Sequence, residues 1–241
     1  MYFLGRSVLV LVIAIAPVLR AENTANPYGH WEGAIATPSG EIQIEIDLAK
    51  SAAGKPVATF SNVKEKLNGL PLANVIIEGE SVAFEIAANG GGKFECGLMD
   101  AGKQMACGFT PATINATLPL TLTRTGEARI ETAPVSAAIA KELEGTWRGA
   151  IESGGRLELI LKLANQSDGT STGSIISVNQ GGIELPITIS GEARKLSFAI
   201  KAVNGAWAGA LNAEGTELAG TFTEQGAAMP LVFRRDAAKR D

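Results

Sequence analysis

The sequence predicts an all-β protein built from two tandem, eight-stranded antiparallel up-and-down barrels. Three observations support this fold class. The sequence contains an internal repeat of two copies, and each copy has short runs in which apolar and polar residues alternate. Turn-forming residues recur every eight to twelve positions. Regularly spaced short strands of this kind are typical of β-sandwiches and β-barrels. Short connections favour an antiparallel meander, and closing eight strands removes both exposed edges, so we expect barrels, with β-sandwiches as the alternative.

The internal repeat sets the domain organisation. The segment GHWEGAI at 29–35 recurs as GTWRGAI at 145–151, and LPL at 118–120 recurs as MPL at 229–231. The spacing between matched segments falls from 116 to 111 residues along the chain, so only small deletions separate the copies. We therefore predict one module at 27–126, a linker at 127–143 and a second module at 144–236, each of ordinary domain size.

Residues 1–21 have the pattern of a cleaved signal peptide. One positive charge, at Arg6, precedes thirteen uncharged residues from Ser7 to Leu19, and Ala21 offers a cleavage site. Thirteen residues suit the core of a secretory signal but are short for a spanning helix, which needs about 20 apolar residues. An uncleaved anchor is the alternative. We expect a periplasmic or secreted protein that is not attached to a membrane after cleavage.

Each module should contain eight strands. In the second module we expect them at 145–152, 156–165, 170–178, 183–190, 195–203, 205–213, 217–224 and 229–236, and the first module gives eight in matching places. Alternation is clean in EIQIEID at 41–47 and in LELILKL at 157–163. Each of these strands therefore has one apolar and one solvated face.

A tryptophan and an arginine should close one end of each barrel. Trp31 and Trp147 lie in a Gly-x-Trp motif in the first strand of each module, and Arg124 and Arg235 lie at the end of each last strand. In a closed meander the first and last strands are neighbours. Residue parity turns both side chains inward, where a guanidinium can stack on an indole. The alternative is a tryptophan that only packs and an arginine that is solvated beyond the strand end.

These residues resemble the pattern of the lipocalin and avidin-like superfamily of calycin-type barrels, in which the Gly-x-Trp tryptophan seals the barrel beneath an arginine of the final strand. The longer string, with NQG at 179–181 and Gly215-x-x-Leu218-x-Gly220, also resembles an uncharacterised β domain found ahead of secreted bacterial serine hydrolases. The first module departs from it at 62–68, where NVKEKLN stands in place of NQG. The resemblance implies an exported, non-catalytic module.

The two cysteines should form a disulfide. Cys96 and Cys107 stand where the second copy has Gly209 and Gly220. A hairpin that turns at 101–102 places them opposite each other, and cross-strand partners satisfy the Cα separation of about 4.4–6.8 Å that a disulfide needs. Because exported proteins retain disulfides, we predict the bond, with two buried thiols as the alternative.

Composition argues against several classes of function. The single histidine, His30, leaves no histidine cluster for a metal and disfavours a Ser/His/Asp or Cys/His catalytic site. The net charge of −4 disfavours nucleic acid as a partner. Parity points His30 outward, so we expect a surface imidazole, and Glu41, Glu45 and Asp47 should form a solvated stripe. We expect no enzyme, no catalytic residues, no metal and no cofactor.

The end of the second barrel opposite the tryptophan is the expected ligand site. Four turns meet there, and an apolar cup with a polar rim is the usual form of a small-ligand site. The rim residues are Asn179, Gln180, Glu224 and Gln225, and the inward residues are Leu159, Leu161, Ile175, Phe198, Ile200, Trp207 and Phe222. Eight-stranded barrels are just wide enough for side chains to fill them or for one small ligand, so a packed core and a pocket both stay open.

Three functions are compatible with this barrel. The first is an exported binding protein, a lipocalin-like carrier of a small apolar molecule. The second is an accessory module whose rim docks on another exported protein such as a serine hydrolase. The third, of another class, is an enzyme that uses the barrel interior, although the two arginines of the barrel ends are the only charges that the pattern points inward. The pattern leaves the relative placement of the modules and the oligomeric state open.

Overall fold

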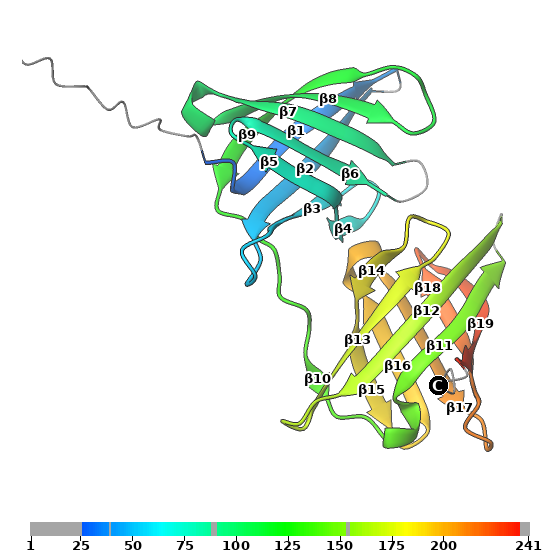
Figure 1. Cartoon of the computed structure of the whole chain (residues 1–241). Coiled ribbons are helices and arrows are strands. Elements are labelled where there is room, and N and C mark those ends of the chain that lie inside the picture. The colour runs from blue at the N-terminus through cyan, green and yellow to red at the C-terminus, as the bar shows by residue number, and fades with distance from the viewer. Residues whose placement is uncertain (1–25, 39, 88–90, 153–154, 237–241) are drawn as a thin grey trace, which may run out of the picture.

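The computed structural model describes residues 26–38, 40–87, 91–152 and 155–236, which form two β-barrel modules (Figure 1). The predicted signal peptide, residues 1–21, lies outside the described residues. In the described part of the chain, no helix is long and apolar enough to cross a membrane.

The first module is an antiparallel sheet of nine strands. Its elements are β1 Gly29–Thr37, β2 Gly40–Lys50, β3 Pro56–Asn62, β4 Leu67–Pro71, β5 Ala73–Glu78, β6 Ser81–Ile86, β7 Gly92–Met99, the 3-10 turn η1 Asp100–Gly102, β8 Gln104–Pro111 and β9 Leu118–Gly126. Consecutive strands pair with each other, as a meander requires, with one exception. Strands β4 and β5 do not pair, because they lie at opposite ends of the strand order.

The second module repeats this arrangement in a sheet of ten strands. Its elements are β10 Ser136–Ala137, η2 Lys141–Leu143, β11 Gly145–Glu152, β12 Arg156–Asn165, β13 Thr170–Ser177, β14 Ile183–Pro186, β15 Thr188–Glu192, β16 Lys195–Ile200, η3 Lys201–Val203, β17 Gly205–Leu211, β18 Glu217–Glu224 and β19 Ala227–Arg235. Most of the predicted strands agree with these bounds to within two residues.

Closure of the first strand onto the last confirms the barrel-like fold. In the first module β1 pairs with β9 and Trp31 stands opposite Arg124. In the second, β11 pairs with β19 and Trp147 stands opposite Arg235. The expectation of a closed meander therefore identified the strand pair that closes each sheet.

The prediction of eight strands per barrel was wrong at the fourth strand, which is divided in both modules. In the second module the chain bends at Ile187, whose backbone N–H is donated to the Gly173 carbonyl. On one side of the bend β14 pairs with β13, and on the other β15 pairs with β16. The first module bends in the same way at Leu72, between β4 and β5, where the backbone N–H is donated to the Ala58 carbonyl. Each sheet is therefore nearly closed, with its gap at this bend.

Part of the predicted linker belongs to the second barrel. Residues Ser136–Ala137 form β10, which pairs with β13 and contacts β15. The Ser136 hydroxyl accepts a hydrogen bond from the Ile189 backbone N–H at 2.8 Å, and the Ser171 hydroxyl donates one to the Ala137 carbonyl at 2.7 Å. The linker strand thus bridges β13 and β15, which the bend of the fourth strand leaves apart.

The two barrels meet through the ends opposite their tryptophans. In Figure 1 the first module stands above the second, and the chain between them passes along one side. Strand β4 contacts η3 and β14 across the junction. In the turn between β13 and β14, Gly181 lies so close to the first module that a Cβ atom there would stand 2.4 Å from the Ala87 carbonyl oxygen. The mouths of the two barrels therefore face each other.

Candidate ligand-binding cavity

The end of the second barrel that carries Trp147 is sealed. The indole N–H of Trp147 is donated to the Leu143 carbonyl at 3.0 Å, and the Arg235 guanidinium carbon lies 4.1 Å from the indole ring centroid. Arg235 also donates hydrogen bonds to the carbonyls of Gly215 and Glu144, at 3.0 and 2.7 Å. The guanidinium therefore stacks on the indole while satisfying backbone carbonyls, as the sequence indicated.

The first barrel has a related arrangement at its own tryptophan. Trp31 is fully buried, and its indole N–H is donated to the Pro27 carbonyl at 2.9 Å. The Arg124 side chain crosses Gly29, where a Cβ atom would stand 2.5 Å from its Nε atom. The glycine of the Gly-x-Trp motif thus provides the space through which the arginine passes. A disulfide joins Cys96 and Cys107, which are directly opposite in the β7–β8 register.

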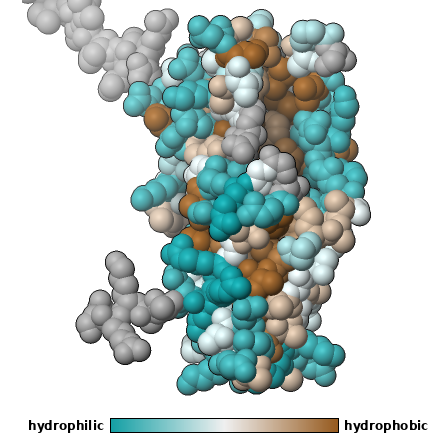
Figure 2. Space-filling view, turned by 90° about the vertical axis from the view of Figure 1, so that its right-hand side faces the viewer, coloured by the Kyte–Doolittle hydropathy of each residue, from teal (hydrophilic) through white to brown (hydrophobic). Residues whose placement is uncertain are grey.

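A cavity of about 450 Å³ lies between the two mouths and is lined by both modules. Most of its lining is apolar. The first module contributes Ile42, Ile44, Phe60 and Phe109, and the second contributes Ile175, Ile183, Ile200 and Phe222, among others. Apolar side chains are also visible at the surface where the modules meet (Figure 2). The site is therefore one shared chamber rather than two separate cups.

The predicted site residues of the second barrel divide into three groups. The cavity lining includes Leu159, Ile175, Gln180, Ile200, Phe222 and Glu224. Leu161, Phe198 and Trp207 are buried outside this lining, and the rings of Phe198 and Trp207 stack with centroids 5.5 Å apart. Asn179 and Gln225 are exposed rim residues outside the lining. The cavity thus lies at the mouth of the second barrel, and the rings of Phe198 and Trp207 pack outside it.

Asn179 has a structural role that the sequence did not suggest. Its side-chain oxygen accepts a hydrogen bond from the Glu158 backbone N–H at 3.1 Å, and its amide group donates one to the Arg156 carbonyl at 2.5 Å. The side chain therefore fixes the turn after β13 to the start of β12. This contact holds the neighbouring Gln180 and Gly181 at the junction with the first module.

The few polar groups of the lining are mostly occupied by local hydrogen bonds. The Ser177 hydroxyl donates to the Gln180 side-chain oxygen at 2.8 Å, and the Asn62 side-chain oxygen accepts from the Glu65 backbone N–H at 3.1 Å. Glu224 differs, because within the described residues its carboxylate has no hydrogen bond or ion pair. Partial burial raises the pKa of Glu224 above its usual range, since desolvation penalises the charged form.

Sequence reasoning missed the half of the cavity that the first module supplies. The repeat implied a second mouth with the same construction, and the first module does place Ile35, Ile44 and Phe109 there. The facing arrangement of the mouths depends on contacts between the modules, such as that of Gly181 with Ala87, which no periodicity within one module encodes.

The prediction of a surface imidazole at His30 was wrong. His30 is 1% exposed and its Nδ1 atom lies 2.8 Å from the Asp47 carboxylate, which also accepts the Arg129 backbone N–H at 2.7 Å. Asp47 is accordingly buried, unlike the solvated stripe expected there. Its partners explain the burial, because the chain that leaves β9 returns over these outward side chains. Glu45, on the same face of β2, remains partly exposed. The pair tethers the start of the linker to the first barrel.

Other features of the described residues offer less to a ligand. A hollow of about 440 Å³ on the outer face of β11, β12 and β19 is lined by Glu152, Arg156 and Glu158. These charges already pair with one another, with nitrogen–oxygen distances of 2.8 and 3.3 Å, so they present no unpartnered group. Among the described residues, no group of three or more histidine, cysteine, aspartate or glutamate side chains could hold a metal ion.

Comparisons with known proteins identify no family for this chain. No protein-family model and no curated protein matches the chain. A protein of unknown function from the DUF3598 family of Nostoc punctiforme PCC 73102 is 15% identical over 89% of this chain and 98% of that one, with a TM-score of 0.27. A "putative outer membrane protein" of Bacteroides fragilis NCTC 9343 is 11% identical over 90% and 99%, also with a TM-score of 0.27. Values this low carry no argument about this chain.

Proposed function

We propose that the protein is an exported, non-catalytic binding protein that encloses one small apolar molecule between its two barrel mouths. The cavity of about 450 Å³, lined by apolar side chains of both modules, is the observation that carries this proposal. Small-molecule sites in proteins typically measure about 300–1,000 Å³ and combine an apolar lining with a few polar groups that orient the ligand.

The proposal keeps the lipocalin-like carrier expected from the sequence and changes where the ligand lies. Trp31 and Trp147 close the outer ends of the two barrels, so the apolar interior is hollow only toward the junction. Each barrel therefore acts as half of the container. Burial on both sides removes more of the apolar ligand surface from water than one shallow cup would.

Export is supported by two features of the chain. The disulfide between Cys96 and Cys107 is of the kind that persists in oxidising compartments. The N-terminal segment has the charge and length pattern of a secretory signal. A periplasmic or secreted location follows from these two features together.

The placement of the rim supports a carrier over a docking module. Of the four rim residues that could meet another exported protein, Gln180 and Glu224 line the cavity, and the turn that carries Gln180 contacts the first module through Gly181. Half of the rim is thus engaged within the chain, and Asn179 and Gln225 are the rim residues left exposed for a complex with an exported hydrolase.

Titration with Nile red, a neutral apolar fluorescent probe, tests the proposal. A shared chamber predicts saturable binding of one probe per chain. Ile183→Trp should weaken binding about tenfold or more, because Ile183 is a partly exposed lining residue and the larger ring would occupy the cavity. The control Ile76→Trp, at a position 53% exposed outside the lining, should leave binding unchanged. Absence of saturable binding, or two equivalent sites per chain, would overturn the proposal.

A further inference from the structure

Building on the proposed function, we infer that the enclosed ligand is a cationic amphiphile, an apolar molecule with a protonated amino group that pairs with Glu224. The inference deepens the proposed function by naming the chemical class of the ligand. It rests on the position of Glu224, on its lack of a partner and on the hydrogen bonds that the neighbouring side-chain oxygens already accept.

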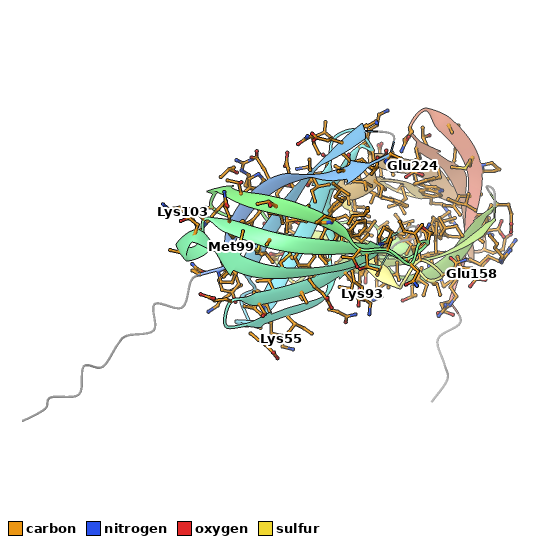
Figure 3. The ribbon with its side chains drawn as sticks, turned by 90° about the horizontal axis from the view of Figure 1, so that it is seen from above. Lys55, Lys93, Met99, Lys103, Glu158 and Glu224 are labelled. Atoms are coloured by element: carbon orange, nitrogen blue, oxygen red, sulfur yellow. A yellow bond between two sulfur atoms is a disulfide. The ribbon has the colours of Figure 1, made fainter. Side chains whose placement is uncertain are left out.

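Glu224 is placed at the cavity by the strand that ends with it. It is the last residue of β18, stands opposite Gly205 in the β17–β18 register, and is labelled in Figure 3. Its side chain lines the cavity together with Val203 and Phe222. Among the described lining residues it is the one with an ionisable side chain, and no lysine or arginine is among them. The described lining therefore has one ionisable group, the carboxyl of Glu224.

Two other carboxylates on the second barrel, those of Glu184 and Glu158, already have partners. Glu184 accepts hydrogen bonds from Ser174 and Lys162, and Glu158 lies 3.3 Å from Arg156. Within the described residues, no such partner is present for the carboxylate of Glu224. A partly buried charge without a partner loses hydration and gains nothing in return. A cationic group in the cavity would restore the lost interaction.

The chemistry of the lining favours an ammonium head over a carboxylate or a hydroxyl. An ammonium donates charge-assisted hydrogen bonds to a carboxylate, which are roughly twice as strong as neutral ones. A ligand carboxylate would place two negative charges in one apolar chamber. The side-chain oxygens of Gln180 and Asn62 already accept hydrogen bonds from Ser177 and Glu65, and Glu224 supplies the carboxylate of the lining, which has no such donor among the described residues. The raised pKa of Glu224 agrees with a carboxylate that lacks a cationic partner.

Displacement of bound Nile red by three twelve-carbon chains tests the inference. Dodecylamine, dodecanol and dodecanoate, each kept below its micellar concentration, share the apolar chain and differ only in the head group. In the native protein, dodecylamine should displace the probe at about tenfold lower concentration than dodecanol, and dodecanoate should be weakest.

The variant Glu224→Gln keeps the shape of the side chain and removes its charge. It should abolish the preference for the amine over dodecanol, and the affinity of the variant for Nile red is measured first so that displacement is compared at equal occupancy of the probe. The matched control Glu214→Gln makes the same charge change in the exposed β17–β18 turn and should keep the preference.

The outcomes separate the two proposals. Equal displacement by amine and carboxylate, or an amine preference that survives Glu224→Gln, would overturn the inference while the carrier function stands. Failure of Nile red and of all three chains to bind would overturn the carrier function and the inference with it.

Discussion

At the scale of single residues, the two modules fill one core position in different ways. In the second module Trp207 lies over two facing glycines, and a Cβ atom at Gly209 or Gly220 would stand 2.6 or 2.5 Å from its ring. In the first module Phe94 occupies the matching place, and the disulfide replaces the glycine pair. Protein interiors are close-packed. The large indole of Trp207 therefore fits only against glycines, which have no side chain, whereas the smaller phenyl ring of Phe94 leaves space for the two sulfur atoms.

We expect Gly209→Ala to lower the free energy of unfolding by about 1–3 kcal/mol, the usual cost of overpacking a core. The added methyl group would meet both the Trp207 ring and the Ala219 carbonyl oxygen. The matched control is Gly97→Ala in β7, where nothing lies within 4 Å of the new Cβ atom. Urea unfolding measures both variants, and an equal effect at the two positions would contradict this explanation of the glycine pair.

The carboxylate of Glu224 also makes stability depend on pH. Its pKa is raised in the folded protein, so folding favours the protonated form, and this contribution is lost as the pH rises through the folded pKa. Glu224→Gln should therefore be slightly more stable than the native protein at pH 7, and the difference should vanish near about pH 3, below the ordinary glutamate pKa. Thermal unfolding at the two pH values measures this, and a loss of stability at pH 7 would show that the carboxylate has a partner.

At the scale of elements, the bend in the fourth strand leaves each sheet unpaired at one place. Strands β14 and β15 pair with different neighbours, and in the second module β10 closes the resulting gap. Backbone groups at such a gap need partners from outside the meander. The linker supplies them through the Ser136 hydroxyl and the Ala137 carbonyl, so it does more than join two domains.

Ser136→Ala should destabilise the second barrel by about 1–3 kcal/mol, because the backbone N–H of the buried Ile189 would lose its acceptor. Amide hydrogen exchange should become faster at Ile189. The control Ser190→Ala changes the next residue of the same strand, whose side chain is exposed, and should leave that exchange unchanged. Unaltered protection of Ile189 in Ser136→Ala would show that β10 does not hold the gap.

At the scale of the whole molecule, a close backbone approach holds the two mouths together. Gly181 and Gly182 both have positive φ, +82° and +67°, so alanine is strained at either. Only Gly181 faces the first module, where the Ala87 carbonyl oxygen lies in the path of a Cβ atom, while nothing lies within 4 Å at Gly182. Comparing alanine variants at these two glycines therefore separates the effect of the junction from the effect of backbone strain.

Gly181→Ala should open the junction, increase the radius of gyration measured by small-angle scattering and weaken Nile red binding. Gly182→Ala carries a similar backbone penalty and should leave both the radius of gyration and the binding unchanged. Identical behaviour of the two variants would indicate that the contact between Gly181 and Ala87 does not set the placement of the modules.

The sequence predicted the local features of the fold better than the features that depend on distant segments. Strand positions, the closing strand pair and the stacking of Arg235 on Trp147 follow from period-two alternation and the internal repeat, which are local signals. The buried His30 did not follow, because parity gives the side of a strand and not the segment that returns over it. The shared cavity did not follow either, since it depends on contacts between modules that are distant in sequence.

The shared chamber is tested most directly by nuclear Overhauser contacts between one bound ligand and isoleucine methyl groups. With one equivalent of Nile red, we predict contacts from the same ligand to Ile44 of the first module and to Ile175 of the second, both in the cavity lining. Contacts confined to the isoleucines of one module, or directed to the exposed Ile76, would contradict a chamber formed by two facing mouths.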